Sequence, residues 1–303
     1  GVGNEEVHAQ LAKKQGSGRR LAFLFSVCDP AIPSRVGANT ARIGGAGRGR
    51  VVFDRFFRAV SRLHRLGFDR LRGFADRHAA RRVLVLGDSH VRVFEHWLFL
   101  VAMPRTRFDV VHVPGGTALG ILSPKSRSGA RRRFDEALAM RRHDAVVVGL
   151  GEVDTDHAVW LSAARTGEPP EAVLDLALTR YFRYLDEVAR REHLIVLGAC
   201  LPTVETYPVD GDPVHKVRAA TGATRRQRTD LALAFNARVA AWCAERGIVH
   251  LDSGPAALGP DGFVRPSWRR RDRLDHHYSR TRFAWWLVRR LRGVVLSGAH
   301  STA

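Results

Sequence analysis

From residue 82 onward, the sequence alternates short apolar runs with longer amphipathic stretches, and this alternation limits the possible folds more than any other feature. Five short, mostly apolar runs are each followed by glycine or polar residues, as expected for strands that are buried on both faces. These runs are 83–86, 108–113, 145–150, 194–197 and 248–251. Helical stretches lie near 90–102, 127–142, 171–192, 225–246 and 279–292. The pattern predicts one doubly wound α/β domain with a parallel five-stranded sheet over 82–292.

The segments outside this predicted domain have a different character. Residues 1–50 include a low-complexity run rich in glycine and arginine, and we expect this basic segment to be poorly ordered. Residues 51–81 predict a basic amphipathic helix, because apolar residues recur at helical spacing from Phe53 to Leu63. Such a helix either packs on the main domain or contacts a membrane surface or a protein partner. Residues 293–303 are expected to form a short tail.

The charge of the chain is strongly positive and unevenly distributed. The sequence has 49 Lys and Arg against 30 Asp and Glu, a formal net charge of +19. Residues 1–82 hold 17 of the basic and 6 of the acidic residues, so weak, salt-sensitive contact with polyanions or anionic membranes is expected there. A GC-rich coding sequence also produces a bias toward arginine, and no recognised nucleic-acid-binding motif accompanies it. We therefore expect no specific nucleic acid partner.

Cysteine content and hydropathy favour a cytoplasmic protein. The three cysteines are widely spaced and form no metal-binding motif, so we expect neither a metal nor another cofactor. No run of about 18 apolar residues predicts a transmembrane helix. Residues 21–28 loosely resemble a signal segment, but their apolar stretch is short and the bulky Val27 precedes Cys28.

Polar or glycine-rich loops follow the first three predicted strands. They comprise residues 87–90, 114–117 and 151–154. The carboxyl ends of parallel strands meet at one edge of a sheet, and ligands of such folds bind beyond that edge. We therefore expect these three loops to converge on the functional site.

Ser89 directly follows the first predicted strand, at the start of a helical stretch. A serine hydroxyl becomes a nucleophile when a neighbouring base takes its proton. Backbone N–H groups at a helix N-terminus can stabilise the negative charge that develops during such a reaction. The simpler alternative is that Ser89 or Asp88 only caps the helix.

A carboxylate and two histidines, Asp275, His276 and His277, lie just before the last predicted helix. A carboxylate beside a histidine can fix the tautomer of the imidazole and stabilise the imidazolium ion. The alternative is a solvated turn before the helix. A serine after the first strand, followed much later by an Asp-His pair before the last helix, favours catalysis more strongly than either motif alone.

Taken together, these motifs resemble the SGNH, or GDSL-type, hydrolase superfamily. The Gly-Asp-Ser block that ends at Ser89 resembles the first block of the family, and Gly115 or Gly116 stands at the glycine of the second block. The loop that ends at Asp154 occupies the place of the third block. His277 and its neighbours resemble the last block, which has the pattern His-Leu-Ser.

The resemblance covers residues 82–292 and implies a flavodoxin-like three-layer α/β/α sandwich. It also implies roles for individual residues. Ser89 would be the nucleophile, His277 the general base and Asp275 the carboxylate that orients the histidine. The backbone N–H groups of Ser89 and Gly116 would form part of an oxyanion hole.

The sequence departs from the family pattern at two points. Val153 replaces the asparagine that donates to the oxyanion, and the loss of one such donor typically costs about 10²–10³ in rate. The family Asp stands three residues before the His, whereas Asp275 is only two residues before His277. The alternative base is therefore His276, with Asp272 as its carboxylate.

The third loop holds further candidate site residues, Gly151, Glu152 and Asp154. A carboxylate at Glu152 would repel an oxyanion unless it is protonated or paired. Glu152 and Asp154 either shape the site, or bind a cation or a sugar hydroxyl there, or they cap the next helix or pair with a local arginine.

A narrower resemblance is to a bacterial SGNH-like group of poorly defined function. The Gly-Asp-Ser-His, Gly-Glu-Val-Asp and Asp-His-His motifs indicate this group, together with Arg228, Asp230 and Asn236. We expect Arg228 to be a surface residue or an ion-pair partner rather than a substrate ligand.

Three functional hypotheses follow. The first is a serine ester hydrolase or acyl-transfer enzyme of SGNH type, whose substrate is a small-molecule ester or an acylated carbohydrate. The second is a non-catalytic SGNH-like domain that binds a glycan or nucleotide-sugar in a polysaccharide pathway, which the loss of the oxyanion asparagine favours. The third is a basic protein that binds polyanions or a membrane surface through residues 1–82.

Overall fold

The computed structural model describes residues 73, 78–210 and 213–297. Residues 1–50 and nearly all of the predicted helix 51–81 lie outside this part of the chain, so the expectations for them remain predictions. Among the described residues, no helix has the length and hydropathy needed to cross a membrane.

In the described part of the chain, five strands form a parallel sheet in the order β2-β1-β3-β4-β5. The strands are β1 (Arg81–Gly87), β2 (Thr106–His112), β3 (Ala145–Gly149), β4 (Leu194–Leu197) and β5 (Val249–Leu251). This order is that of flavodoxin-like folds. It confirms the predicted fold class, and the observed strand ends lie within two residues of the predicted ones.

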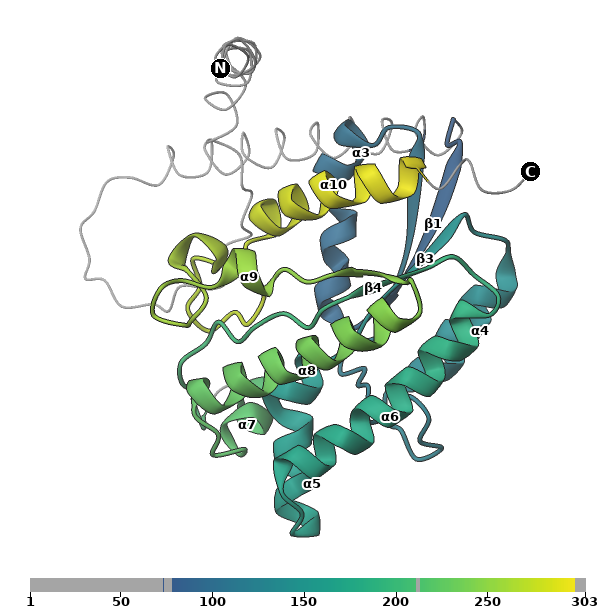
Figure 1. Cartoon of the computed structure of the whole chain (residues 1–303). Helices are drawn as coiled ribbons and strands as arrows, with labels where there is room; N and C mark the ends of the chain where they lie inside the picture. The colour runs from purple at the N-terminus through teal and green to yellow at the C-terminus, as the bar shows by residue number, and fades with distance from the viewer. Residues whose placement is uncertain (1–72, 74–77, 211–212, 298–303) are drawn as a thin grey trace, which may run out of the picture. The chain divides into compact units, whose positions relative to one another are not determined.

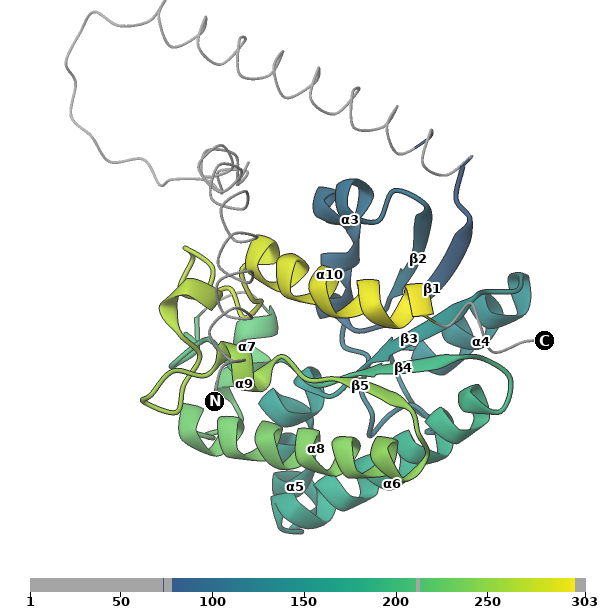
Figure 2. The same cartoon turned by 45° about the horizontal axis from the view of Figure 1, so that its top comes forward.

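Helices cover both faces of the sheet, so the domain is a three-layer α/β/α sandwich (Figure 1). On one face lie η1 (Ser89–Glu95), α3 (Trp97–Ala102) and α10 (Arg280–Ser297). On the other lie α4 (Ala130–Met140), α5 (Val159–Thr166), α6 (Pro170–Ala189) and α8 (Arg225–Glu245). Figure 2 shows α10 on one side of the strands, with α6 and α8 on the opposite side. Helix α10 extends into the predicted tail.

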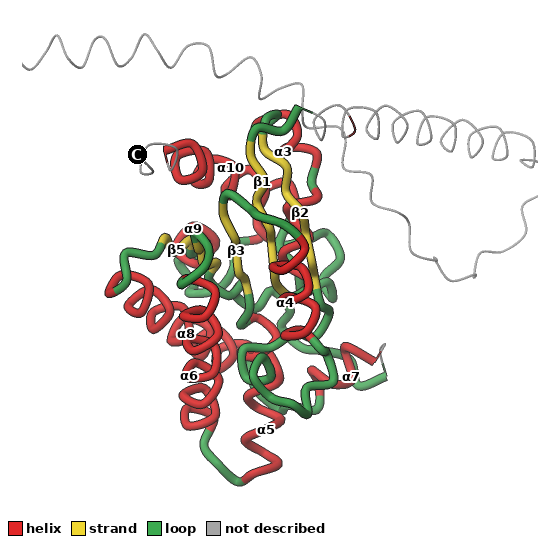
Figure 3. Tube along the Cα trace, turned by 90° about the vertical axis from the view of Figure 1, so that its right-hand side faces the viewer, coloured by secondary structure: helices red, strands yellow, loops and turns green. Residues whose placement is uncertain are grey.

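The strands are apolar on both faces because each face is covered by helices. Successive side chains of a strand point to opposite faces. In β1, Val85 therefore belongs to the same buried cluster as Leu287 of α10, whereas Leu86 belongs to the cluster of Tyr181 of α6. Figure 3 shows this arrangement from the side, with α10 and α6 separated by the strands. The continuous apolar runs in the sequence have this physical cause.

Several short elements were not anticipated from the sequence. They are α5, the π-helical turn η2 (Asp154–Ala158), α7 (Pro213–Ala219), α9 (Gly254–Ala257) and the 3-10 turn η3 (Pro266–Trp268). Each contains at most eight residues, too few to establish a helical hydrophobic period. A π-helical turn is also a feature that is frequent at functional sites.

The carboxyl ends of β1 and β3 lie side by side, at the point where the strand order changes direction. Ligands of this class of fold bind at that point. The two strand ends approach so closely that a Cβ atom on Gly87 would lie 2.3 Å from the carbonyl oxygen of Gly149. The glycine before Asp88 is therefore required by packing, and it allows Ser89 to emerge directly at this edge.

Candidate active site

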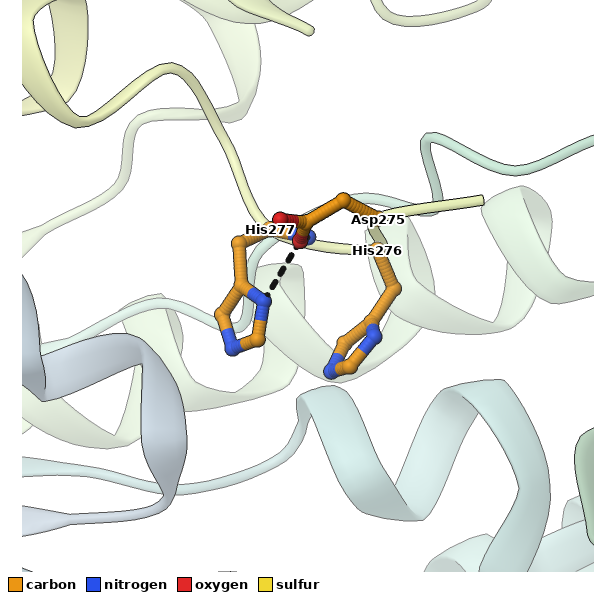
Figure 4. Close-up of side chains that lie close together, drawn as sticks. All are labelled: Asp275, His276 and His277. Atoms are coloured by element: carbon orange, nitrogen blue, oxygen red, sulfur yellow. Dashed lines mark hydrogen bonds and ion pairs between the residues drawn. The ribbon is translucent and has the colours of Figure 1, made fainter. Parts of the chain in front are cut away.

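Ser89, His277 and Asp275 form a chain of hydrogen bonds at this edge. Nε2 of His277 lies 2.9 Å from Oγ of Ser89, and Nδ1 lies 2.7 Å from Oδ1 of Asp275. Figure 4 shows the contact between the histidine and the carboxylate. The distances suit a neutral imidazole in which Nδ1–H donates to Asp275 and Nε2 accepts the hydroxyl proton of Ser89. The predicted nucleophile, base and carboxylate are thus brought together.

Asp88, rather than Ser89, provides the side-chain cap of η1. One carboxylate oxygen of Asp88 accepts the backbone N–H of His90 at 2.8 Å, which satisfies an amide of the first turn. The hydroxyl of Ser89 lies 2.9 Å from the His277 ring instead. Asp88 therefore caps the helix, as one alternative proposed, and the hydroxyl of Ser89 is not used as a cap.

A turn at Asp275 explains why two residues, rather than three, separate the carboxylate from the base. Oδ1 of Asp275 accepts the backbone N–H of His277 at 3.0 Å and also contacts the Nδ1 atom of its ring. An aspartate that bonds to the backbone two residues later forms a local turn of its own. Arg270 donates to the other carboxylate oxygen at 2.7 Å, and the Thr203 hydroxyl donates to the Asp275 carbonyl at 3.2 Å.

The pKa values of the pair favour an ionised carboxylate and a neutral base. Burial alone would raise the pKa of Asp275, but the hydrogen bonds from His277 and the nearby charge of Arg270 hold it well below its usual value. Burial lowers the pKa of His277 below 6.5, the charge of His90 lowers it further, and Asp275 opposes the change. At neutral pH, His277 is therefore ready to accept a proton.

The alternative pair of His276 and Asp272 does not form. The ring of His276 lies against that of His277, with centroids 4.1 Å apart, and burial lowers its pKa to about 3. Oδ1 of Asp272 accepts the backbone N–H of Leu274 at 3.0 Å, in the turn before the site. Within the described residues, no hydrogen bond joins Asp272 to His276. This choice between two adjacent histidines depends on the direction of each ring, which the sequence does not give.

The expectation that Gly116 donates to an oxyanion is wrong for this structure. Its backbone N–H donates to the carbonyl of Val113 at 2.9 Å. The bond closes a turn over residues 114–115, which directs that amide back toward the end of β2. Val153 is buried and has no polar atom in its side chain. The amide of Gly116 and the side chain of Val153 therefore do not supply the oxyanion donors that the family pattern implies.

Asp154 joins two loops at the strand ends and does not pair with an arginine. Its carboxylate accepts the backbone N–H groups of Ala118 at 2.7 Å and Leu119 at 2.8 Å. Burial raises its pKa to about 7, and the two amides oppose the shift. Gly151 begins the same loop with a φ angle of +121°, and a Cβ atom there would lie 2.5 Å from the ring of Phe235. Asp154 and Gly151 therefore fix the loop that follows β3 against its neighbours.

Glu152 forms an ion pair with an arginine, which is one of the alternatives that the sequence left open. Arg218 of α7 donates to its two carboxylate oxygens at 2.8 and 3.2 Å. Burial alone would raise the pKa of Glu152, but the charges of Arg218 and His90 hold it well below its usual value. The carboxylate is therefore ionised, and its charge is compensated within the protein.

The ion pair continues into a buried network. Arg218 also donates to Asp156, and Asp156 accepts from Arg228 at 2.6 Å. Arg228 donates further to the carbonyl of Val204 at 2.9 Å. Only 2% of Arg228 is exposed, so the ion-pair interpretation holds and the surface interpretation is wrong. We did not anticipate Arg218 from the sequence, because no pattern distinguishes it from the many other arginines.

A cavity of about 430 Å³ opens beside the hydrogen-bonded triad. It is lined mainly by polar and charged residues, with a few apolar side chains. The lining includes Ser89, His90, Arg92, Val93, His215, Arg270, Asp272, Leu274, Asp275, His276, His277, Tyr278, Arg280 and Phe283. The volume suits a small organic molecule.

Two groups of described residues are close enough to hold a metal ion. The first is Asp275 with His276 and His277, and the second is Asp88 with His90 and Glu152. Ser89 already engages the first group, and in the second the guanidinium of Arg218 already pairs with Glu152. The hydrogen-bonding pattern fits proton transfer better than metal binding.

No protein-family model matches the sequence, and no curated protein matches it. Solved structures are similar in fold. A carbohydrate acetylesterase from Sinorhizobium meliloti has a TM-score of 0.47 and 14% identity, and the match covers 71% of this chain and 99% of that one. An aryl esterase from M. smegmatis has a TM-score of 0.45 and 16% identity, with coverages of 71% and 99%.

A GDSL-like lipase from Bacteroides thetaiotaomicron gives a TM-score of 0.43 and 11% identity, with coverages of 76% and 98%. With TM-scores below 0.5, these similarities do not by themselves assign an activity to this chain.

Proposed function

We propose that this protein is a serine ester hydrolase or acyl-transfer enzyme of SGNH type. The observation that supports this proposal most directly is the continuous chain of hydrogen bonds from Ser89 through His277 to Asp275. A base within hydrogen-bonding distance of a serine hydroxyl, itself oriented by a third group, is the arrangement that activates a serine nucleophile.

The reaction follows from this geometry. Oγ of Ser89 attacks the carbonyl carbon of an ester while Nε2 of His277 takes the hydroxyl proton. Asp275 stabilises the resulting imidazolium ion. The carbon–oxygen bond of the ester breaks as His277 returns the proton to the departing alcohol, which leaves an acyl group on Ser89. Water or an acceptor hydroxyl then attacks the acyl group with the same base, and the serine is regenerated.

The cavity favours a polar substrate with a short acyl group. Its lining combines Arg92, Arg270 and Asp272 with histidines, and only a few apolar residues interrupt them. A long fatty acyl chain requires an extended apolar surface, which this lining does not offer. An O-acetylated carbohydrate fits these requirements, and release of acetate from acetylated oligosaccharides tests this substrate class.

The competing proposal is a non-catalytic domain that uses the same cavity to bind a glycan or nucleotide-sugar. It is favoured by Val153 and by the occupied N–H of Gly116, which both reduce the expected stabilisation of an oxyanion. The two proposals differ in whether the serine is activated.

A fluorophosphonate probe distinguishes them, because it reacts with a serine only when a base activates the hydroxyl. We expect stoichiometric labelling at pH 7.5, with the adduct mapped by mass spectrometry to the peptide that contains Ser89. Acid-denatured protein is the control and should remain unlabelled, because denaturation separates His277 from Ser89. Native protein that stays unlabelled, with the probe shown to be active on a known serine esterase, would exclude the enzyme.

The pH dependence of the rate should follow the protonation of His277. Since burial lowers its pKa, kcat for a short aryl ester should rise with pH through a value below 6.5 and then level off. Asp275→Asn should lower kcat by about 10³–10⁴, because an amide fixes the wrong tautomer of the ring. The acidic limb should also move to lower pH, because Asp275 raises the pKa of His277.

Asp230→Asn is the matched control for this experiment. Asp230 is an exposed carboxylate whose contact with Arg226, at 3.7 Å, lies outside the site. The control should keep both the rate and the pH profile of the unmodified protein. An Asp275→Asn variant with an equally unchanged profile would show that Asp275 does not orient the base.

A further inference from the structure

His90 follows the nucleophile directly but has no place in the triad. Its side chain lies in the lining of the same cavity as Ser89, and the residue is 9% exposed. The centroid of its ring lies 4.6 Å from that of His277 and 5.7 Å from that of His276. The ring is therefore a near neighbour of the reacting atoms.

One nitrogen of the His90 ring faces two carboxylates. Nδ1 lies 3.2 Å from Oδ1 of Asp88 and 3.7 Å from Oε2 of Glu152. Both carboxylates are buried, so a proton on Nδ1 is strongly stabilised. Burial alone would lower the pKa of His90, but these two charges raise it to about 9.

The charge balance of the buried network also requires this proton. Asp88, Glu152 and Asp156 supply three negative charges, whereas Arg218 and Arg228 supply two positive charges. A protonated His90 makes this group of contacts neutral. An isolated charge in a protein interior is costly, so a neutral network is the favoured state.

The other nitrogen of the ring has no partner. Nε2 is buried and makes no hydrogen bond among the described residues. In an imidazolium ion this atom carries a proton and can only donate. A buried donor without an acceptor is unfavourable, and here it belongs to a residue that lines the same cavity as Ser89.

We propose that the Nε2–H of His90 donates a hydrogen bond to the oxyanion that forms when Ser89 attacks an ester. This inference rests on the proposed function. In the step, the bond from Oγ of Ser89 to the carbonyl carbon forms, and the hydroxyl proton passes to Nε2 of His277. The carbonyl electron pair moves to the oxygen, which accepts the hydrogen bond from His90 until the alcohol leaves. His90 keeps both of its protons throughout.

This role replaces the donor that Val153 does not supply. A charged donor forms a stronger hydrogen bond to an anion than a neutral one does. Glu152 then acts through His90 as a positioning residue, because it holds the proton on Nδ1. The carboxylate that would otherwise repel the oxyanion thus supports the cation beside it.

The test compares two variants with the unmodified enzyme on a short aryl ester. His90→Leu removes both ring donors, and kcat should fall by about 10²–10³ with little change in KM, because the lost bond exists only in the transition state. His90→Gln restores a neutral donor and should recover part of the loss. His193→Leu, at an exposed histidine outside the site, should keep the unmodified rate.

The pH profile provides a readout that a structural role would not change. His90 is faced by Asp88 and Glu152, by Arg218, and by His276 and His277. The unmodified enzyme should lose activity as pH rises through about 9, because His90 loses its proton there. This alkaline decline should be absent from His90→Gln. A decline that persists unchanged in the variant would overturn the proposal.

A measurement on the unmodified protein covers the case in which the variants fail to fold. Nuclear magnetic resonance of histidine labelled with ¹⁵N should show both ring nitrogens of His90 protonated at pH 7.5. A neutral ring would overturn the proposal. Suppose that the unmodified enzyme is active and that His90→Leu folds but keeps a kcat within about threefold of the unmodified value. In that case this inference fails, while the proposed function stands. If the unmodified protein neither hydrolyses esters nor reacts with a fluorophosphonate, the proposed function itself fails.

Discussion

Ser89→Ala should reduce kcat for hydrolysis of a short aryl ester by at least about 10⁴, down to the rate of the uncatalysed reaction in the assay. The substitution removes the atom that forms the acyl intermediate, and no other hydroxyl among the described residues is bonded to His277. The fold should be unaffected, because the Ser89 side chain does not provide the cap of η1. Initial rates with p-nitrophenyl acetate, corrected for the buffer reaction, measure the effect.

Two further variants make this experiment specific. Ser162→Ala, on α5 and outside the cavity lining, should keep the full rate. His277→Ala should lose nearly as much activity as Ser89→Ala, and the double variant should lose little more than either, because the two residues act as one unit. Equal rates for Ser89→Ala and the unmodified protein would show that hydrolysis proceeds without this serine.

The largest effect on stability is expected for Arg218→Met. Arg218 is 3% exposed and lies between the carboxylates of Glu152 and Asp156. Its removal leaves Glu152 without its arginine and Asp156 with one arginine, Arg228, and the hydroxyl of Tyr207, and breaking a buried pair in this way costs about 3–5 kcal/mol. Urea unfolding at pH 7 should show this loss in the free energy of unfolding.

The stability loss should depend on pH in a defined direction. Because Arg218 holds the pKa of Glu152 below its unfolded value, this pairing contributes stability above about pH 4.5 and loses it as pH falls through the lower, folded value. The difference between the variant and the unmodified protein should therefore shrink on acidification.

Arg132→Met is the matched control for Arg218→Met. Arg132 pairs with Glu136 at 3.4 Å, but 79% of its side chain is exposed. Exposed pairs of this kind contribute about 0–1 kcal/mol. If Arg218→Met cost no more than this control, the buried network would not be a source of stability.

The fold was predictable because its physical cause extends over many residues. The central strands are covered on both faces, so their runs are almost entirely apolar, and the long helices α4, α6 and α10 show a hydrophobic period. Short elements such as α7 have no such signal. The π-helical turn η2 has a hydrogen-bond spacing that differs from that of an α-helix, so neither the helical nor the strand pattern of apolar residues predicts it.

The triad was partly predictable because its members stand next to strand and helix ends. Ser89 follows β1, and His277 comes three residues before α10. The sequence could not decide between His276 and His277, because that choice depends on which ring turns toward the serine. The resemblance in sequence also implied that the backbone N–H of Gly116 donates to an oxyanion. A sequence does not show which backbone N–H groups are already hydrogen-bonded within a turn.

The buried network was predictable only in part, because the sequence suggested ion pairs for Glu152 and Arg228 but did not identify their partners. The partners Glu152 and Arg218 are 66 residues apart along the chain, so only the folded structure shows that α7 brings them together. Because the chain contains many arginines, the few that are buried cannot be distinguished from the others by sequence. The signal that was available was the Asp156 carboxylate near an apolar segment, which requires a partner when it is buried.

The nucleophile and its base are supplied by opposite ends of the folded domain, 188 residues apart along the chain. During synthesis, the serine leaves the ribosome long before the loop that activates it has been made. A chain cut before residue 275 lacks the proposed base and its carboxylate, so under the proposed function we expect its serine to stay unreactive toward a fluorophosphonate. Reactivity at Ser89 would then report that the loop carrying His277 has docked.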